Sequence, residues 1–183
     1  VCVSTAGPGA TTLVTGLATA FMDSTPVVAI AGQVSKTLLG RDGFQEADIR
    51  AISMPVTKHN YLITDIRDLP DALKEAFYIA RTGRPGPVLV DITKCVQQDS
   101  MEFTYPTTVN LPGYRPNRLT PDAAVIDRVA RLLNEAQRPV IVAGQGVSMA
   151  KAEVELRQLA EKANIPVATS LLGVGTFPAT HPL

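Results

Sequence analysis

Two cations flank one apolar stretch in the middle of this chain. Arg84 lies in the turn formed by residues 83–87, and Lys94 comes just past the apolar run 87–92. The turn is stiff, because each proline biases the residue before it toward an extended backbone. Buried parallel strands present polar side chains to ligands at their carboxyl ends, so Lys94 is well placed to bind an anion. The alternative is that both cations are solvated and merely flank a core strand.

The separation of these two cations limits what they can do together. Ten residues of chain separate their positions. An extended strand rises about 3.3 Å per residue, so the two side chains lie up to roughly 33 Å apart. We therefore expect two separate sites, one at Arg84 and one at Lys94, rather than a clamp on one small anion.

Turns that contain glycine stand between a predicted strand and a predicted helix in both halves of the chain. The first is Gly7-Pro8-Gly9 and the second is Gly144-Gln145-Gly146. Glycine permits a tight turn and close approach of a ligand, and the first amides of the following helix can meet an acceptor. The second turn lacks the third glycine of a dinucleotide fingerprint. Each segment can also be a turn and nothing more.

Two further segments carry side chains of mixed chemistry. Phe44 is a large apolar residue in the polar loop 32–46, where it either serves a ligand or anchors the loop to the core. His59 lies in a run of hydrogen-bonding residues, 57–60, and has no partner at metal-ligand spacing, so we expect a surface or interface histidine and no metal site. Cys95 has no adjacent base in the sequence, which argues against a nucleophile.

The elements that must position these residues alternate between strand and helix, which predicts the α/β class. Strands are expected at 1–4, 27–30, 61–64 and 87–92, with helices at 10–22, near 45–51 and at 68–81. The last helix is the clearest, because one face gathers apolar residues at helical spacing. These residues are Leu69, Leu73, Ala76, Phe77 and Ala80. The run 87–92 is continuously apolar, as a parallel strand covered on both faces should be.

The residue composition changes between residues 97 and 120, where prolines and polar residues without periodicity predict a connecting segment. A second unit then follows, and it starts with Thr120 as N-cap and Pro121 at the first helical position. Its predicted elements are a helix to about residue 136, a strand at 140–143, a helix at 148–163 and a strand at 166–169. The predicted domains are 1–97 and 120–183, joined by the linker 98–119.

Composition excludes several classes of protein. The chain has 183 residues, 45% of them hydrophobic and 19% charged, which suits a packed core and not a disordered chain. The formal net charge is zero, so nothing favours nucleic acid as a partner. No apolar run reaches the ~18–20 residues of a membrane helix. The chain begins without Met and within a strand, so we expect a piece of a longer protein.

Taken together, these segments resemble the large catalytic subunit of acetohydroxyacid synthase, also called acetolactate synthase. The resemblance is carried by Gly7-Pro8-Gly9-Ala10-Thr11, Gly32-Gln33-Val34, Gly43-Phe44-Gln45-Glu46, Thr57-Lys58-His59-Asn60 and Gly83-Arg84-Pro85-Gly86-Pro87. It spans essentially the whole chain. It implies a thiamine-diphosphate-binding fold, with the C-terminal part of a pyrimidine-binding domain at 1–97 and the first part of a Rossmann-like, FAD-associated central domain at 120–183.

The resemblance also implies roles for individual residues. Phe44, Gln45 and Lys94 would be catalytic residues beside the substrate. Residues expected to bind the thiamine or flavin cofactor are Pro8, Gly9, Thr12, Gln33, Arg84, Gly144, Gln145, Gly146, Ser170, Leu171 and Gly173. The implied cofactors are thiamine diphosphate, FAD and Mg²⁺, and the Mg²⁺ ligands are expected outside this chain.

The implied activity is decarboxylation of pyruvate and transfer of the two-carbon unit to pyruvate or 2-oxobutyrate, in branched-chain amino-acid biosynthesis. The chain alone is expected to be inactive. The expected partners are small 2-oxo acids, further copies of the full chain in a homodimer or homotetramer, and a regulatory small subunit. The expected location is the cytoplasm of a bacterium, with a plastid left open. Alternatives are a glyoxylate carboligase, a sulfoacetaldehyde acetyltransferase or a non-catalytic nucleotide-binding module.

Overall fold

The computed structural model describes residues 1–116 and 120–183, which form two compact units, Val1–Arg118 and Leu119–Leu183. Each unit is built of alternating strands and helices. The elements of the first unit are β1 (Cys2–Ser4), α1 (Pro8–Met22), β2 (Val28–Gln33), α2 (Ile49–Ser53), β3 (His59–Ile63), α3 (Leu69–Arg81), β4 (Val88–Thr93) and α4 (Lys94–Gln98), with short 3-10 turns at Met54–Val56 and Ile66–Asp68.

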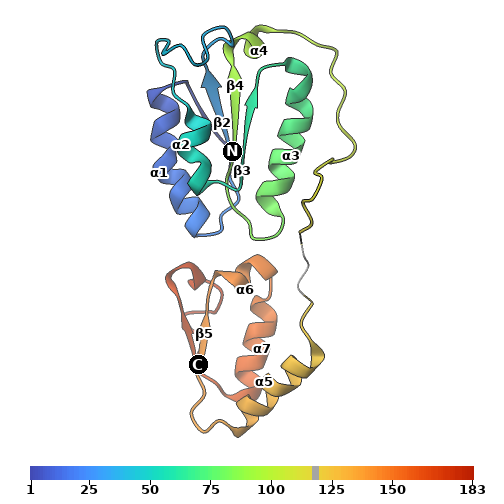
Figure 1. Cartoon of the computed structure of the whole chain (residues 1–183). Coiled ribbons are helices and arrows are strands. Elements are labelled where there is room, and N and C mark those ends of the chain that lie inside the picture. Colours follow the sequence, from blue (N-terminus) through green and yellow to red (C-terminus); the bar gives the residue numbers. More distant parts are fainter. Residues whose placement is uncertain (117–119) are drawn as a thin grey trace. The chain divides into compact units, whose positions relative to one another are not determined.

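The first unit is a parallel sheet between two layers of helices. Its strand order is β1-β2-β4-β3, and every neighbouring pair is parallel. Helices α1 and α2 lie on one face and α3 lies on the other (Figure 1). Parallel neighbours need a crossover connection, so each strand is followed by a helix before the chain returns to the sheet. The α/β class predicted from the sequence is confirmed.

Strand β4 lies between β2 and β3, and its side chains are buried on both faces of the sheet. Val88 and Val90 pack with α3, whereas Leu89 packs with α1 and α2. This alternation follows from the period of two in a strand. It also turns Asp91, the next residue in the alternation, toward the α1–α2 side, where its side chain is buried.

Several predicted boundaries need correction. Strand β2 runs on to Gln33, three residues past its predicted end, because Ala31, Gly32 and Gln33 stay in register with β4. Helix α1 already begins at Pro8, where proline fits the first helical position, and Gly7 takes the positive φ of 57° that the turn requires.

The predicted core face of α3 is partly wrong. Phe77 is 43% exposed, while Ala72 and Ile79 are buried in its place. The buried stripe therefore lies to one side of the predicted one, because Ala72, Ala76 and Ile79 are the residues that meet the sheet. Gly83 follows the helix with φ of 61°, as a glycine just past a helix end should.

The segment after α4 packs along the first unit before it enters the second. Leu111 and Tyr114 contact the hydrophobic core beneath α3. The Tyr114 hydroxyl donates to the carbonyl of Thr82 at 3.1 Å, so it helps to satisfy the C-terminal end of α3.

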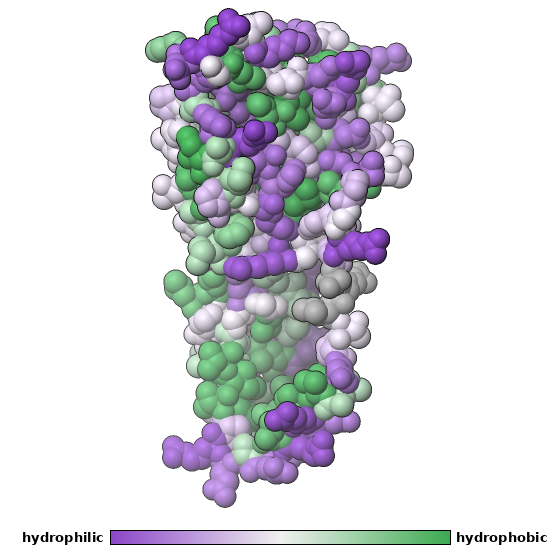
Figure 2. Space-filling view, viewed as in Figure 1, coloured by the Kyte–Doolittle hydropathy of each residue, from purple (hydrophilic) through white to green (hydrophobic). Residues whose placement is uncertain are grey.

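The second unit is smaller, and apolar residues gather on the face of it that Figure 2 shows. Its elements are α5 (Ala123–Glu135), β5 (Ile141–Ala143), α6 (Gln145–Ala150), α7 (Glu153–Ala163), β6 (Val167–Thr169) and a 3-10 turn at Leu171–Gly173. Strands β5 and β6 are parallel neighbours. Val125, Val129 and Leu132 of α5 are each about half exposed.

Two predictions for this unit are wrong. Thr120 does not cap α5, because the carboxylate of Asp122 accepts from the amide of Ala124 and makes Asp122 the N-cap. The predicted helix 148–163 is two helices, since Lys151 takes a left-handed conformation, with φ of 56°, between α6 and α7. The Ser148 hydroxyl spans the break by donating to Glu153.

Candidate functional site

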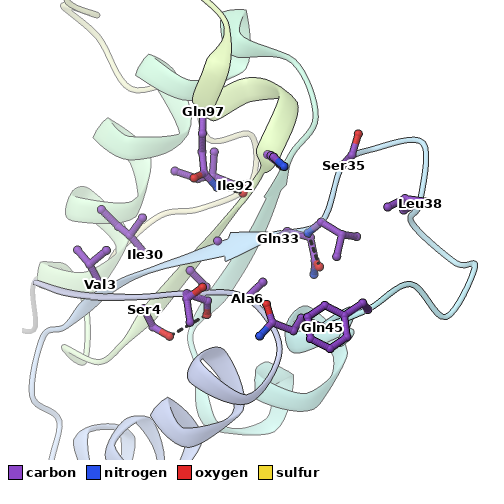
Figure 3. Close-up of a pocket in the computed structure, with 16 residues that line it drawn as sticks. Val3, Ser4, Ala6, Ile30, Gln33, Ser35, Leu38, Gln45, Ile92 and Gln97 are labelled. Carbon is purple, nitrogen blue, oxygen red and sulfur yellow. Dashed lines mark hydrogen bonds between the residues drawn. The ribbon is translucent and has the colours of Figure 1, made fainter.

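A pocket of about 900 Å³ opens at the carboxyl ends of β1, β2 and β4. Its lining consists of residues 3–6, residues 30–35, Leu38, Phe44, Gln45, Ile92, Lys94 and Gln97. Figure 3 shows Gln45 and Leu38 on one side of this space and Gln97 and Ile92 on another. The carboxyl edge of a parallel sheet is where open α/β folds bind ligands. The pocket thus brings together Phe44, Gln45, Lys94 and Gln33 of the predicted site residues.

The loop between β2 and α2 carries Phe44 and Gln45 to the pocket. Phe44 is 90% exposed, so the alternative that it anchors the loop to the core is wrong. Gln45 has a φ of 62°, a left-handed conformation that is rare for residues other than glycine. An exposed aromatic ring beside a strained residue gives the loop apolar surface and an amide at the pocket.

The carboxylate of Glu46 holds the tip of this loop together. It accepts hydrogen bonds from the amides of Gly40, Arg41 and Gly43, the last at 2.9 Å. These backbone donors, led by Gly40, lower the pKa of Glu46, because they stabilise the ionised carboxylate. The turn that presents Phe44 and Gln45 is therefore closed by the residue that follows them.

The turn that begins α1 approaches the same loop. A Cβ on Gly7 would lie 2.7 Å from the carbonyl oxygen of Gln45, too close for any other residue. Glycine at this position therefore lets the Gly7-Pro8-Gly9 segment lie directly against Gln45. The two motifs are far apart in the sequence, and the fold makes them neighbours.

Lys94 is the first residue of α4 and lines the pocket from the end of β4. Its side chain is exposed, so the ammonium group can reach a ligand from the solvent side. Arg84 precedes the same strand, at the opposite end, and does not line the pocket. It donates to the Ser24 hydroxyl at 2.7 Å and to the carbonyl of Met22 at 2.9 Å, which caps the end of α1. The two cations serve different places, as expected.

Pro8, Gly9 and Thr12 lie in the first turns of α1 and do not line the pocket. The Thr12 hydroxyl donates to the carbonyl of Gly9 at 2.7 Å. Gly9 is closely packed, because an added Cβ would lie 2.6 Å from the Thr5 methyl group. Their assignment to a cofactor stays a prediction.

In the second unit the two segments predicted to bind flavin lie side by side. Gly144 follows β5, and Ser170 follows β6, so both stand at the carboxyl edge of this pair of parallel strands. The amide of Ser170 donates to the carbonyl of Ala143 at 2.9 Å. A Cβ on Gly173 would lie 2.3 Å from that same carbonyl oxygen, so only glycine fits there. Gln145 and Gly146 open α6, and Leu171 is 88% exposed beside them.

Sequence reasoning missed several residues of the site. Ser4, Thr5 and Ala6 line the pocket because Ser4 ends β1 and the other two follow it at the same edge of the sheet. Ser35, Leu38 and Gln97 also line it. The signal that could have found the first group was their place after a strand that ends beside β2. For Leu38, which comes from the middle of a loop, no such signal exists.

Asp91 is the residue of greatest consequence that sequence reasoning left without a role. It is only 1% exposed, and its Oδ2 accepts from the Gln33 amide at 2.9 Å. Within the residues that the structure describes, its Oδ1 has no hydrogen-bond partner. Burial raises the pKa of Asp91 to about 7, and the hydrogen bond from Gln33 opposes this only in part.

The described residues offer neither a metal-binding cluster nor a membrane-spanning helix. Residues 1–116 and 120–183 contain no group of three or more His, Cys, Asp or Glu side chains that could hold a metal ion. None of the helices that the structure describes is both long and apolar enough to span a membrane.

Comparison with known proteins accounts for both units. The family described as "Thiamine pyrophosphate enzyme, N-terminal TPP binding domain" matches residues 1–52, and "Thiamine pyrophosphate enzyme, central domain" matches residues 126–183. The chain is 56% identical over 183 residues to the acetolactate synthase large subunit of Corynebacterium glutamicum, covering 100% of this chain and 29% of that protein.

Similar relatives come from distant organisms. A probable acetolactate synthase large subunit of Methanocaldococcus jannaschii is 50% identical over 186 residues, with 100% of this chain and 31% of the relative covered. The chloroplastic acetolactate synthase 1 of Oryza sativa subsp. japonica is 47% identical over 184 residues, with 100% and 28% covered. The chain thus spans less than a third of the length of these relatives. On this likeness, which runs through both units, the chain belongs to the thiamine pyrophosphate enzymes and is similar over its whole length to acetolactate synthase large subunits.

Proposed function

We propose that the complete protein to which this chain belongs is an acetolactate synthase. It would decarboxylate pyruvate and join the two-carbon unit to pyruvate or 2-oxobutyrate, a reaction of branched-chain amino-acid biosynthesis. The observation that supports this most is the pocket at the carboxyl edge of the sheet, where an exposed aromatic ring, an amide and an ammonium group meet. The relatives named acetolactate synthase add weight, because their likeness covers the whole chain.

The three side chains suit a small 2-oxo acid. The Lys94 ammonium would neutralise the substrate carboxylate, and the Gln45 amide can donate to its carbonyl oxygen. Phe44 would pack against the methyl group of pyruvate and keep water away from it. Thiamine diphosphate, when bound, supplies the carbanion chemistry, and these residues position the acid beside it.

The thiamine fit rests on the contact between Gly7 and Gln45. Because no side chain fills the space at Gly7, the backbone of the Gly7-Pro8-Gly9 turn can lie close to Gln45 and to a ligand held there. Pro8, Gly9, Thr12 and Gln33 are the proposed thiamine contacts.

FAD is proposed for the second unit. In it Gly144 and Ser170 lie close together, with a Cβ on Gly144 reaching 3.6 Å from the Ser170 hydroxyl oxygen. This glycine-lined edge, with Gln145, Gly146, Leu171 and Gly173 around it, leaves backbone groups open to a flat ligand. Arg84 is the proposed flavin contact from the first unit. Mg²⁺ is proposed to bind ligands that lie outside this chain.

The remaining proposals concern partners and location. Family likeness favours a homodimer or homotetramer of the complete protein, with a regulatory small subunit as a further partner. We also propose a bacterial cytoplasmic location. Since relatives include chloroplastic proteins, a plastid is the alternative.

The test is product formation by the complete protein with thiamine diphosphate, FAD, Mg²⁺ and pyruvate. Acetolactate should form. Lys94→Met should lower kcat/KM for pyruvate by roughly a hundredfold, because it removes a charge-assisted contact to the substrate carboxylate. Lys36→Met is the matched control, because Lys36 is an exposed lysine that does not line the pocket. It should leave the rate unchanged.

Other outcomes separate the alternatives. Turnover of glyoxylate or sulfoacetaldehyde without acetolactate from pyruvate would indicate a sibling enzyme of the same cofactor class. Flavin binding without any thiamine-dependent turnover would indicate a nucleotide-binding module. The two units alone should show no synthase activity.

A further inference from the structure

One buried side chain is bound to both ends of the loop that carries Phe44 and Gln45. The Gln33 carbonyl oxygen accepts from the amide of Val34 at 2.9 Å, where the loop leaves β2. Its amide nitrogen donates to the carbonyl of Ala47 at 2.8 Å, where the loop returns toward α2. Figure 3 draws Gln33 at the base of the pocket with the first of these bonds. One amide therefore joins the start of the loop to its end.

The orientation of this amide is determined by its neighbours. The Val34 N–H can only donate, so the Gln33 oxygen must face it, and the nitrogen must then face Ala47. An amide nitrogen carries two N–H groups, and the second needs an acceptor, since Gln33 is only 6% exposed. Asp91 Oδ2, at 2.9 Å, is that acceptor.

Asp91 stands where a hydrophobic residue would otherwise belong. Its neighbours on the strand, Val90 and Leu89, are fully buried, and Asp91 itself is 1% exposed. A carboxyl group in this place is costly, and its Oδ1 has no partner among the residues that the structure describes. Among the described residues the carboxyl group has one hydrogen bond, from Gln33, so what it provides is an acceptor for the Gln33 amide.

We propose that Asp91 and Gln33 act as one positioning unit, which holds the loop of residues 34–47 in the conformation that presents Phe44 and Gln45 to the pocket. Asp91 orients the amide, and the amide ties the two ends of the loop together. Glu46 closes the tip of the loop, whereas this buried pair fixes its base. Neither member needs to touch the substrate. The proposal rests on the proposed function only where it expects a change in the rate with pyruvate, and the loop conformation itself does not depend on that function.

The loop conformation can be measured without any assay of activity. Hydrogen exchange of peptides covering residues 34–47 in the complete protein reports how often the loop opens, and peptides from α3 serve as an internal reference. Asp91→Ala should accelerate exchange in the loop by roughly tenfold, since the Gln33 amide loses its acceptor and the tie at Ala47 weakens with it. Gln33→Ala should give at least the same acceleration.

Three further variants sharpen the test. Asp91→Asn keeps an oxygen acceptor for Gln33 and should exchange like the wild type. The double variant Asp91→Ala/Gln33→Ala should exchange no faster than Gln33→Ala alone, because the two residues act through one hydrogen bond. Ser53→Ala is the matched control. It removes a buried hydroxyl that donates to Ile49 at 2.7 Å, outside the loop, and should leave loop exchange unchanged.

Additive effects in the double variant would overturn the proposal, and so would loop exchange in Asp91→Asn that matches Asp91→Ala. If Asp91→Ala fails to fold, Gln33→Ala and Asp91→Asn carry the same comparison. In the activity assay, Asp91→Ala and Gln33→Ala should lower kcat/KM for pyruvate, whereas Asp91→Asn should keep the wild-type value. If the wild-type protein forms no acetolactate but Asp91→Ala and Gln33→Ala still accelerate loop exchange, the proposed function is refuted and the positioning unit is supported.

Discussion

Replacing Asp91 with asparagine should make the protein less sensitive to alkaline pH. In the folded chain burial holds the pKa of Asp91 at about 7, against an ordinary value of 3.8. Between these two values the folded protein keeps the proton while the unfolded chain has lost it. Unfolding therefore releases a proton, and stability must fall as the pH rises through this window.

The structure sets the size of the effect. The difference between 3.8 and about 7 is worth about 4 kcal/mol at most, at roughly 1.4 kcal/mol for each pKa unit. More than half of this, about 2–3 kcal/mol, should appear between about pH 5 and about pH 8. Asp91→Asn keeps the hydrogen bond from Gln33 but cannot ionise, so the variant should show no such loss of stability as the pH rises.

The assay is urea unfolding of the complete protein followed by circular dichroism, with both proteins measured at the same set of pH values. Subtracting one curve from the other cancels every titrating group that the two proteins share. The advantage of Asp91→Asn should be small in acid and grow toward pH 8. Asp99→Asn is the control, because Asp99 is exposed just past α4. Equal pH dependence in wild type and Asp91→Asn would refute the reasoning that burial penalises the charge.

Three further predictions concern the elements around the pocket. Gly7→Ala should lower the free energy of unfolding by about 2 kcal/mol or more and displace Gln45, because the turn needs a positive φ and has no room for a Cβ. Gly16→Ala, in open space on α1, should raise it by about 0.5–1 kcal/mol, and thermal melts compare the two variants. Lys58→Met should destabilise by about 2 kcal/mol, since the ammonium donates to carbonyls at the end of α3, and Lys58→Arg should recover part of the loss in the same melts. Glu46→Gln should weaken the hydrogen bonds at the loop tip and speed hydrogen exchange of the amides there. In the wild type these amides should be fully protected above about pH 4.5, and the protection should be lost as the pH falls through the lowered pKa of Glu46.

Local pattern was sufficient for most of the elements. The apolar run that became β4 and the helical spacing of α3 are properties of short segments, so strand, helix and the parallel α/β class followed from them. Boundaries were less predictable. The last residues of β2 became strand only because β4 pairs with them, and Asp122 replaced Thr120 as the cap of α5 because its carboxylate accepts from the amide of Ala124.

The candidate site was predictable in part. Lys94 was marked by its place after an apolar strand, and Phe44 stood out among polar neighbours. The family resemblance implied that they meet beside one substrate, but local pattern alone could not show it, because their meeting depends on the order in which the strands pair. The exposure of Phe44 was equally hidden, since the same residue could have packed into the core.

What the sequence determined by itself is therefore the chemistry available and the family likeness: cations after strands, glycine turns before helices, and motifs shared with acetolactate synthases over the whole chain. Only the tertiary structure decided that Gly7 lies against Gln45, that Arg84 caps α1, and that Asp91 and Gln33 tie the loop at its base. The physical reason is distance along the chain. Each of these contacts joins segments that are remote in sequence, and it exists only because a parallel sheet brings the carboxyl ends of its strands to one edge and their amino ends to the other.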